Sequence, residues 1–499
     1  MNDTRTSPVQ FFGHPRGLAT LFFTELFERF SFYGMRALLV LFLTASLVDG
    51  GLGVDTKTAG AIYGVYTGAV YLFALPGGWV ADRIFGQRKS VWYGGIMIAI
   101  GHFMMATTLT SMFYLGLLMI ALGTGLLKPN ISAIVGDLYR DQPGARRDAG
   151  FSLFYMGINL GGALAPLVSG TIGETLGYHW GFLTAGVAML IGLIQYRLTS
   201  HHLGDAGLLP KVSAPTEQRR NGRFLFAGMS ALVLSVATIW MGWVVISPAQ
   251  VASAMGQVMV VCAIGFFGSV LLFGGLDGAE KKRVFVIIVF FLCAALFWAG
   301  FEQAATTFNL FARDLTDRSL LGGWFEGHQH PTSWYQTINS VYIILLSPFF
   351  AWLWVALGKR HLDPSAPLKF GLGLVLLGLG FAVLIMASQL IISSGGKVGP
   401  QWLLLTYLLH TFGELCLSPI GLSNVTKLAP PRFAGQMMGT WFLGAAMGNL
   451  VAGLIGGEIG SDVATMPVEF THMTLIGVGA GGLVLLASPL LRRWMGSIR

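Results

Sequence analysis

The sequence predicts an all-α integral membrane protein, and its composition and its long apolar segments are the observations that predict this class. Of 499 residues, 54% are hydrophobic and 68 are glycine, so about two thirds of the chain is apolar or glycine. Only 11% are Asp, Glu, Lys or Arg, whereas about a quarter is usual in soluble domains. These proportions exclude a soluble protein of this size and leave no room for a large catalytic domain outside the membrane.

Fourteen apolar segments are long enough to cross a membrane as helices, which takes about 20 residues each. They are expected near residues 17–47, 58–81, 90–109, 113–135, 149–171, 177–199, 224–246, 251–274, 284–312, 333–357, 369–393, 401–426, 434–457 and 471–491. Polar stretches separate them into groups of six, two and six. The chain is therefore predicted to contain an N-terminal six-helix bundle (1–199), a cytoplasmic linker with two inserted membrane-spanning helices (200–283) and a C-terminal six-helix bundle (284–499).

The positions of lysine and arginine support this number of spans, because cytoplasmic loops carry an excess of positive charge. With the N-terminus inside, 24 of the 31 basic residues fall in cytoplasmic segments, 4 fall outside and 3 lie within spans. A wrong number of spans would scramble this asymmetry. Both termini are thus predicted to be cytoplasmic, and the net charge of +8 is interpreted as a topology signal, without a nucleic-acid partner.

Two six-helix halves are typical of the major facilitator type of transporter, in which the halves rock around a central site. The segment GGWVADRIFGQRK at residues 77–89 resembles that superfamily's loop between its second and third helices. Its two glycines, Gly77 and Gly78, are expected to permit close helix approach, and Asp82 can pair with arginines or with a helix end. The sequence therefore favours the major facilitator fold.

Charged residues inside the expected spans are the most informative feature, since such residues are costly in a membrane and usually mark a function. They are Glu25, Glu28, Arg29, Arg36, Lys128, Glu302 and Glu414. Helical spacing places Glu25, Arg29, Tyr33 and Arg36 on one stripe of the first span. With four acids against three bases, the set is balanced when one carboxylate carries a proton, which indicates proton coupling.

Five segments together resemble the motifs of the proton-coupled oligopeptide transporter family. They are ELFERFSFYG (25–34), GTGLLKPNISAIVGDLY (123–139), FSLFYMGINLG (151–161), FWAGFEQ (297–303) and GELCLSPIGL (413–422). The two extra helices in the middle of the chain resemble those of the bacterial members. The resemblance implies a symporter that imports di- and tripeptides with the inward proton gradient, by alternating access.

The resemblance also implies roles for individual residues. Glu25, Glu28 and Glu302 match positions of proton coupling. The substrate-binding positions are Arg29, Tyr33, Tyr71, Lys128, Asn159, Trp298, Asn339, Glu414 and Trp441. Arg29 and Lys128 would hold the peptide carboxylate, to which arginine offers a planar two-point fork and lysine a compact charge. Glu414, with the two asparagines, would receive the peptide amine, so that the opposite charges select a zwitterion of limited length.

Two ion pairs are expected to act as gates. The resemblance pairs Arg36 with Glu302 at the extracellular opening and Lys128 with Glu414 toward the cytoplasm. A proton on Glu302 would weaken the first pair, and a bound carboxylate would compete for Lys128 in the second. The chain departs from the family at Phe32, where a tyrosine is frequent, and its second span lacks the histidine of mammalian members. Carboxylates are therefore expected to carry the proton.

An enzyme is not expected, because no nucleophile or metal cluster stands near a membrane face. No metal site and no cofactor other than the coupling proton are predicted. The expected partners are di- and tripeptides, protons and membrane lipids, and the expected state is a functional monomer in the bacterial inner membrane. The alternative is a proton-coupled transporter of the same fold for another small anion, drug or peptide-like compound. Retention of Glu414 beside Arg29 and Lys128 favours the zwitterion.

Two further patterns have a structural interpretation. His410 stands four residues before Glu414 on one helical face, where it could relay protons, but a hydrogen-bonded packing residue is favoured. The glycines 371, 373, 378 and 380 superficially resemble a nucleotide-binding loop. No strand precedes them, and small residues suit the packing of membrane helices. We therefore expect helix contacts at these glycines.

Overall fold

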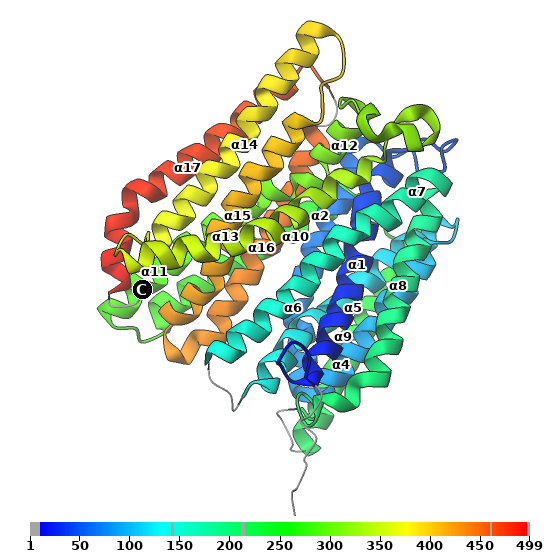
Figure 1. Ribbon diagram of the computed structural model, residues 1–499. Coiled ribbons are helices and arrows are strands. Elements are labelled where there is room, and N and C mark those ends of the chain that lie inside the picture. The colour runs from blue at the N-terminus through cyan, green and yellow to red at the C-terminus, as the bar shows by residue number, and fades with distance from the viewer. Residues whose placement is uncertain (1–9, 141–143, 211–214, 460–461, 497–499) are drawn as a thin grey trace, which may run out of the picture. The chain divides into compact units, whose positions relative to one another are not determined.

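The computed structural model describes residues 10–140, 144–210, 215–459 and 462–496 (Figure 1). Its internal contacts group into two compact units. Unit 1 comprises Met1–Met35 and Phe73–Ile246, and unit 2 comprises Arg36–Leu72 and Ser247–Arg499. The first boundary falls within one continuous helix, α1 (Arg16–Thr44). This helix therefore contributes its first part to unit 1 and its last part to unit 2.

The regular elements of unit 1 are helices in its described part, which also contains one isolated β-bridge, between Phe11 and His14. After the first part of α1 come α3 (Ala74–Val80), the π-helical turn η1 (Ala81–Phe85), α4 (Gln87–Met105), α5 (Thr110–Leu138), α6 (Gly144–Ala165), the π-helical turn η2 (Pro166–Gly170), α7 (Thr171–Leu176), α8 (Tyr178–Thr199), the 3-10 turn η3 (Ser200–Leu203) and α9 (Pro215–Trp240). Helices α4 and α5 pack closely together, and α8 packs against α4.

Unit 2 begins with the last part of α1 and α2 (Thr56–Leu72). It continues with α10 (Pro248–Phe273), α11 (Gly278–Phe301), the 3-10 turn η4 (Glu302–Ala305), α12 (Thr307–Asp314), the 3-10 turns η5 (Ser319–Trp324), η6 (Glu326–His328) and η7 (Thr332–Gln336), α13 (Thr337–Lys359), α14 (Ala366–Ser394), α15 (Gln401–Leu428), η8 (Pro431–Phe433), α16 (Ala434–Ile459) and α17 (Met466–Met495). Its core is a large cluster of apolar side chains from α11, α14, α15 and α16.

The expected spans all fall on helical segments. Among the described residues, twelve helical segments are long and apolar enough to cross a membrane. The two other expected spans are α1, which carries four of the intramembrane charges, and α4, which begins with the polar residues QRKS. The all-helical membrane fold is thus confirmed. The division into two six-helix halves and an insert follows the order of the spans along the chain, and it stays a prediction.

Three spans are interrupted, although the sequence favours continuous helices. The span expected at 58–81 breaks between α2 and α3, the span at 149–171 contains the π-helical turn η2, and the span at 284–312 changes to the 3-10 turn η4. Pro166 opens η2 and has no backbone N–H to donate to the helical ladder. Hydrophobic periodicity does not report such local changes of hydrogen bonding, which frequently occur at functional sites.

The glycines of α14 confirm their interpretation as helix contacts. Gly371 and Gly378 face α17, where a Cβ at either position would press on backbone atoms of that helix. Gly373 and Gly380 face α15, and a Cβ at Gly380 would overlap the ring of His410. Figure 1 shows α14 and α17 lying side by side along most of their length. Small residues on two faces thus allow α14 to approach two neighbours closely.

The segment at 77–89 behaves as expected at only one of its two glycines. A Cβ at Gly77 would overlap the carbonyl of Gly125 in α5, so its absence permits close approach of α3 and α5. Gly78 meets no atom within 4 Å, and the expectation of a close approach there is wrong. The two glycines are adjacent on a helix and therefore point in different directions.

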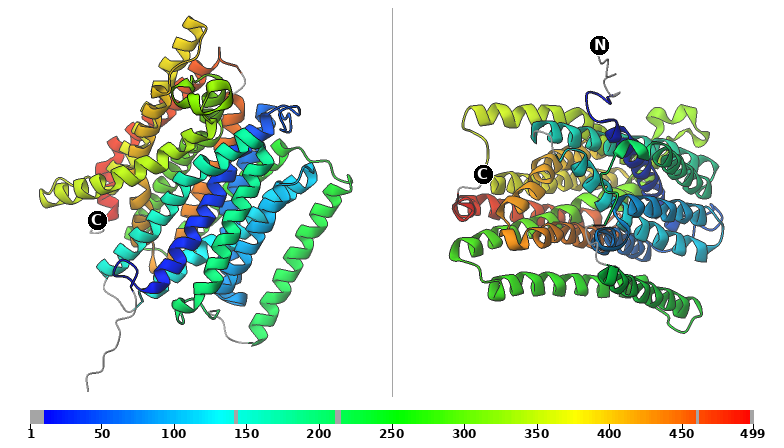
Figure 2. Two further views of the ribbon diagram at one scale, coloured as in Figure 1. Left: turned by 45° about the vertical axis from the view of Figure 1, so that its right-hand side comes forward. Right: turned by 90° about the horizontal axis from the view of Figure 1, so that it is seen from below.

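Two arginines of this segment contact the residues that follow α8 and begin α9. The Nη1 of Arg83 donates to a carboxylate oxygen of Glu217, at the start of α9, over 2.8 Å. The Nε of Arg88 donates to the carbonyl oxygen of Ala206 over 2.7 Å. Figure 2 (left) shows α9 standing apart from the other helices of unit 1 beyond this point. Helix α9 is therefore attached to its unit near its first residues.

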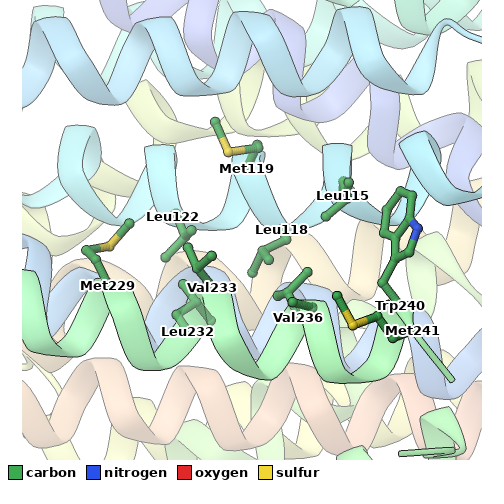
Figure 3. Close-up of a pocket in the computed structure, with 11 residues that line it drawn as sticks. Leu115, Leu118, Met119, Leu122, Met229, Leu232, Val233, Val236, Trp240 and Met241 are labelled. Carbon is green, nitrogen blue, oxygen red and sulfur yellow. The ribbon is translucent and has the colours of Figure 1, made fainter. Parts of the chain in front are cut away.

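An apolar groove lies between part of α5 and the second half of α9 (Figure 3). It has a volume of about 410 Å³ and is lined by Leu115, Leu118, Met119, Leu122, Met229, Leu232, Val233, Val236, Ala237, Trp240 and Met241. None of these side chains carries a charge, so the groove offers no partner for the charged ends of a peptide. Its lining matches the acyl chains of a membrane.

Gly481 and Gly482 are neighbours in α17 with different surroundings, and they provide a matched test of the α14–α17 contact. A Cβ at Gly481 would lie 2.7 Å from the carbonyl oxygen of Gly371, whereas a Cβ at Gly482 would meet no atom within 4 Å. We expect Gly481→Ala to lower stability by about 1 to 3 kcal/mol through overpacking, and Gly482→Ala to leave it unchanged. Thermal unfolding in detergent measures both. Equal melting temperatures would contradict the close approach.

Candidate functional site

Three charged residues of α1 form a buried cluster in unit 1. The Nη2 of Arg29 donates to Glu28 Oε1 over 2.6 Å, and the Nε of Arg29 donates to the other oxygen of the same carboxylate. The Nε also lies 3.4 Å from Oε1 of Glu25, one helical turn earlier. All three residues are at most 4% exposed. The arginine is therefore held by two carboxylates away from water.

Neighbouring groups fix the position of this arginine. The guanidinium carbon of Arg29 lies 5.0 Å from the ring centre of Phe32, within the range of a cation–π contact. Gly161 of α6 faces the same turn of α1, and a Cβ there would lie 3.1 Å from Cβ of Arg29. Phe32 thus contacts the cluster through its ring face.

The other predicted residues of unit 1 lie on three helices. Lys128 is half-buried on α5, which continues without a break through Pro129. Asn159 is buried on α6, and its Nδ2 donates to the carbonyl oxygen of Tyr155 over 3.0 Å. Tyr33 is half-buried on α1, with its ring edge-on to Phe32 at 5.4 Å. Their roles toward a peptide stay predictions.

A second buried cluster joins α1, α2 and η4 in unit 2. The Nη2 of Arg36 lies 2.7 Å from Oε2 of Glu302, as the expected pairing requires. The hydroxyl of Tyr63 accepts a hydrogen bond from the Nε of Arg36 and donates one to the same oxygen of Glu302, each over 3.0 Å. The side chains of the ion pair are less than a tenth exposed. A tyrosine therefore bridges the cation and the anion.

The change from α11 to η4 places Glu302 in this cluster. Directly after it, the buried Gln303 donates through Nε2 to the carbonyl oxygens of Ala299 and Ala452, over 3.2 and 3.1 Å. The hydroxyls of Thr306 and Thr307 both donate to Oε1 of Gln303. This amide thus joins α11, α12 and α16 at the point where the helix changes its form.

A third cluster lies on α13 and α15 in unit 2. The Nδ2 of Asn339 donates to Oε2 of Glu414 over 3.0 Å and contacts the hydroxyl of Thr411 at 3.1 Å. Glu414 is buried, and its contact with Asn339 agrees with the expected grouping of these two residues. The Nε2 of His410 lies 3.0 Å from the carbonyl oxygen of Leu377, among phenylalanine rings. His410 is therefore a packing residue here, as favoured.

The three predicted aromatic residues of unit 2 differ in their surroundings. Trp298 is half-buried on α11, where Gly448 of α16 allows the backbones to approach. Tyr71 is half-buried near the end of α2, against a small apolar cluster with α10 and α16. Trp441 is buried in the large core of the unit, and its ring stands edge-on to that of Phe370, with centres 6.2 Å apart.

The structure thus brings together two of the expected groups of unit 2 and the α1 cluster of unit 1. The expected pair of Lys128 and Glu414 joins residues of different units and stays a prediction. Tyr63, Gln303 and Thr411 were not predicted from the sequence as members of these clusters. A hydroxyl or amide in an apolar span needs a hydrogen-bond partner, so such a residue indicates that another polar group lies nearby. The identity of that partner is not readable from the chain.

Comparison with known proteins identifies the family. A family model described as the POT family matches residues 88–461. The chain belongs to the POT family. The peptide transporter YePEPT of Yersinia enterocolitica is 45% identical over 495 residues, which cover 97% of this chain and 96% of the relative. A di-/tripeptide transporter of Lactococcus lactis subsp. cremoris is 37% identical over 513 residues, with both chains fully covered.

Solved structures of POT proteins share the fold over nearly the whole chain. A peptide transporter POT in complex with sulfate matches with a TM-score of 0.88 and 40% identity, covering 98% of this chain and 97% of the other. A POT family transporter in complex with 5-aminolevulinic acid matches with a TM-score of 0.88 and 32% identity, covering 97% and 98%. These matches confirm the expected transporter fold.

Proposed function

We propose that this chain is a proton-coupled symporter that imports di- and tripeptides by alternating access. The observation that carries the proposal is the pair of buried charged clusters with different chemistry, one built on Arg29 and one on Glu414. The relatives named above as peptide transporters support the same substrate class. The carboxylate of a peptide zwitterion suits the cluster of Arg29, and its ammonium group suits the cluster of Glu414.

The carboxylate end of the peptide is assigned to Arg29 and Lys128. Arg29 is already held by Glu28 and Glu25. When both glutamates are ionised, their two negative charges balance the positive charges of Arg29 and Lys128. One proton on a glutamate leaves an excess positive charge. A peptide carboxylate would then restore the balance, which couples proton uptake to substrate binding.

The two glutamates differ in how firmly they hold the arginine. Glu28 contacts it through both oxygens, whereas Glu25 contacts it through one oxygen at 3.4 Å. The second oxygen of Glu25 has no hydrogen-bond partner among the described residues. A proton there would break no hydrogen bond, so we assign the coupling proton of this cluster first to Glu25, with Glu28 as its alternative.

The amine end of the peptide is assigned to Glu414. An ammonium group needs an anion and further acceptors, and Glu414 supplies two carboxylate oxygens, one of them held by Asn339. Asn159 is proposed as a further acceptor through its amide oxygen, since its nitrogen is bonded to its own helix. Tyr33, Tyr71, Trp298 and Trp441 are proposed to contact the peptide side chains by area, which tolerates many sequences.

The cluster of Arg36, Tyr63 and Glu302 is proposed as the extracellular gate. Its contacts hold α1, α2 and η4 together within unit 2. A proton on Glu302 would remove the ionic part of the contact and leave only hydrogen bonds, which lowers the cost of separating these elements. Lys128 and Glu414 are proposed as the gate pair on the cytoplasmic side.

The family is one of membrane transporters, and we place this chain in a bacterial inner membrane with both termini in the cytoplasm, as its basic residues predict. We propose that it acts as a monomer, without enzymatic activity, metal or cofactor, and that protons, peptides and lipids are its partners. The parts of the chain proposed to move are the two predicted six-helix halves, residues 1–199 and 284–499, which differ from units 1 and 2. Residues 200–283 are the proposed insert between these halves.

The alternative substrate is another small anion, drug or peptide-like compound. A POT family transporter has been solved in complex with 5-aminolevulinic acid. This complex supports, as alternative substrates, compounds that carry an amino group and an acid group separated by a short chain. The Glu414 cluster gives no anchor to a plain anion. We therefore rank peptides first and peptide-like amino acids second.

Proton flux in vesicles tests the proposal directly. With purified protein in sealed vesicles, externally added dialanine should drive proton entry, reported by an internal pH-sensitive dye. Nitrate added in the same way should not. Proton entry driven by nitrate and not by dialanine would contradict the peptide assignment and favour the alternative.

Glu414→Ala should weaken the binding of dipeptides with a free amino terminus by about tenfold to a hundredfold, which is the loss in affinity expected for one charged hydrogen bond. N-acetylated dipeptides lack the cation and should lose little. Competition against labelled dialanine measures both, with Glu326→Ala, an exposed site on η6, as the matched control. Equal losses for free and acetylated peptides would remove the amine role of Glu414.

Glu25→Gln and Glu28→Gln test the coupling cluster, because the amide keeps the shape of the side chain but cannot change its charge. We expect each variant to keep peptide exchange in counterflow, which needs no proton release, and to lose uptake driven by an inward proton gradient. The effect should be larger for Glu25. Normal gradient-driven accumulation by a variant would move the coupling role to Glu302.

A further inference from the structure

Two hydrogen bonds join α12 to the last part of α1 in unit 2, in addition to the ion pair of Arg36. The Nδ2 of Asn309 donates to the carbonyl oxygen of Ala37 over 2.9 Å. About two helical turns further along α1, the hydroxyl of Thr44 accepts from the Nη1 of Arg313 over 2.8 Å. Helix α12 therefore holds the end of α1 at two further points.

The amide of Asn309 is only partly satisfied in this contact. The residue is 1% exposed, and its Oδ1 has no hydrogen-bond partner among the described residues. The carbonyl of Ala37 lies inside a continuous helix, where it already accepts from the backbone N–H four residues later. The contact therefore buries a strongly polar group and compensates only part of the cost of removing it from water.

The contacts on either side of Asn309 are better satisfied. On one side, the hydroxyl of Tyr63 bridges the two members of the ion pair. On the other side, Thr44 accepts from Arg313 and also donates to the carbonyl oxygen of Val40 over 2.8 Å. Of these contacts, only that of Asn309 includes a buried polar atom without a hydrogen-bond partner among the described residues.

We propose that Asn309 eases the opening of the extracellular gate, because its incompletely bonded amide raises the free energy of the closed contact between α12 and α1. The inference rests on the proposed alternating access and deepens it, since α1 belongs to one of the moving halves and α12 to the other. When the two helices separate, outside water reaches the amide and satisfies both of its polar atoms. The cost of burial then disappears, so the amide favours the open state.

Asn309→Leu should therefore hold the gate closed, because leucine is similar in size and gains from burial. A cysteine at Leu41, which lies between the two contact points on α1 and is 1% exposed, reports on opening. In protein freed of its three native cysteines, an impermeant maleimide added outside should label Leu41→Cys more slowly. The expected decrease caused by Asn309→Leu is about threefold to thirtyfold.

Asn221→Leu is the matched control. Asn221 on α9 is also buried, and its Nδ2 has no hydrogen-bond partner among the described residues, but it lies in unit 1. Its substitution should leave the labelling rate unchanged, and an equal decrease there would overturn the inference. Unchanged or faster labelling in Asn309→Leu would also overturn it, because removal of a contact that stabilises the closed gate opens the gate. Asn309→Met carries the same test if the leucine variant does not fold, since methionine adapts to irregular spaces.

Thr44→Val tests the neighbouring contact in the opposite direction. Valine keeps the shape of threonine but cannot accept from Arg313, so labelling of the reporter should become about twofold to tenfold faster. Combined with Asn309→Leu, it should return the labelling rate toward that of the wild type, because both contacts act on the same opening. A double variant that is labelled as slowly as Asn309→Leu alone would refute the inference.

The labelling needs no peptide, so it separates the role of Asn309 from the proposed function. If the wild-type protein shows no dialanine-dependent proton entry, the proposed function is wrong. If it does, and Asn309→Leu is labelled as fast as the wild type, only the role of Asn309 is wrong.

Discussion

The cost of placing a charge inside a membrane governs where the ionised side chains of both units lie. Arg29 sits between two carboxylates, and Arg36 shares its carboxylate with a tyrosine hydroxyl. Each cation is held by groups of its own unit and is almost fully buried. Removing one partner would leave a charge in an apolar medium, so these pairs fix the helices that carry them.

The same cost makes these pairs responsive. A proton or a peptide terminus that changes the charge of one member changes the free energy of the whole cluster, because water is not available to compensate. Rigid packing then keeps the helices around the cluster in place when its free energy changes. Close glycine contacts hold α14 against α15 and α17, and the amide of Gln303 fixes the turn that carries Glu302. Charge can change at sites whose framework stays in place.

The sequence predicted the features that depend on composition and charge. Long apolar segments marked the spans, and single charges within them, such as Arg36 and Glu302, marked the clusters. The interruptions of three spans could not be predicted, because they depend on local hydrogen bonds and leave hydrophobic periodicity unchanged. Tyr63 was missed because a neutral hydroxyl does not stand out in an apolar helix. Gly77 and Gly78 read alike in the chain, yet only one faces a neighbour.

The attachment of α9 has a consequence for handling the protein. The Arg83 and Glu217 side chains that hold its first turn are 42% and 33% exposed, so dissolved ions can screen their attraction. The buried pairs at Arg29 and Arg36 are shielded from such screening. Raising the ionic strength of a purification buffer should thus loosen the first turn of α9 while the charged clusters stay intact. The choice of detergent should also affect how firmly α9 is held, because the groove beside α9 is lined only by apolar side chains.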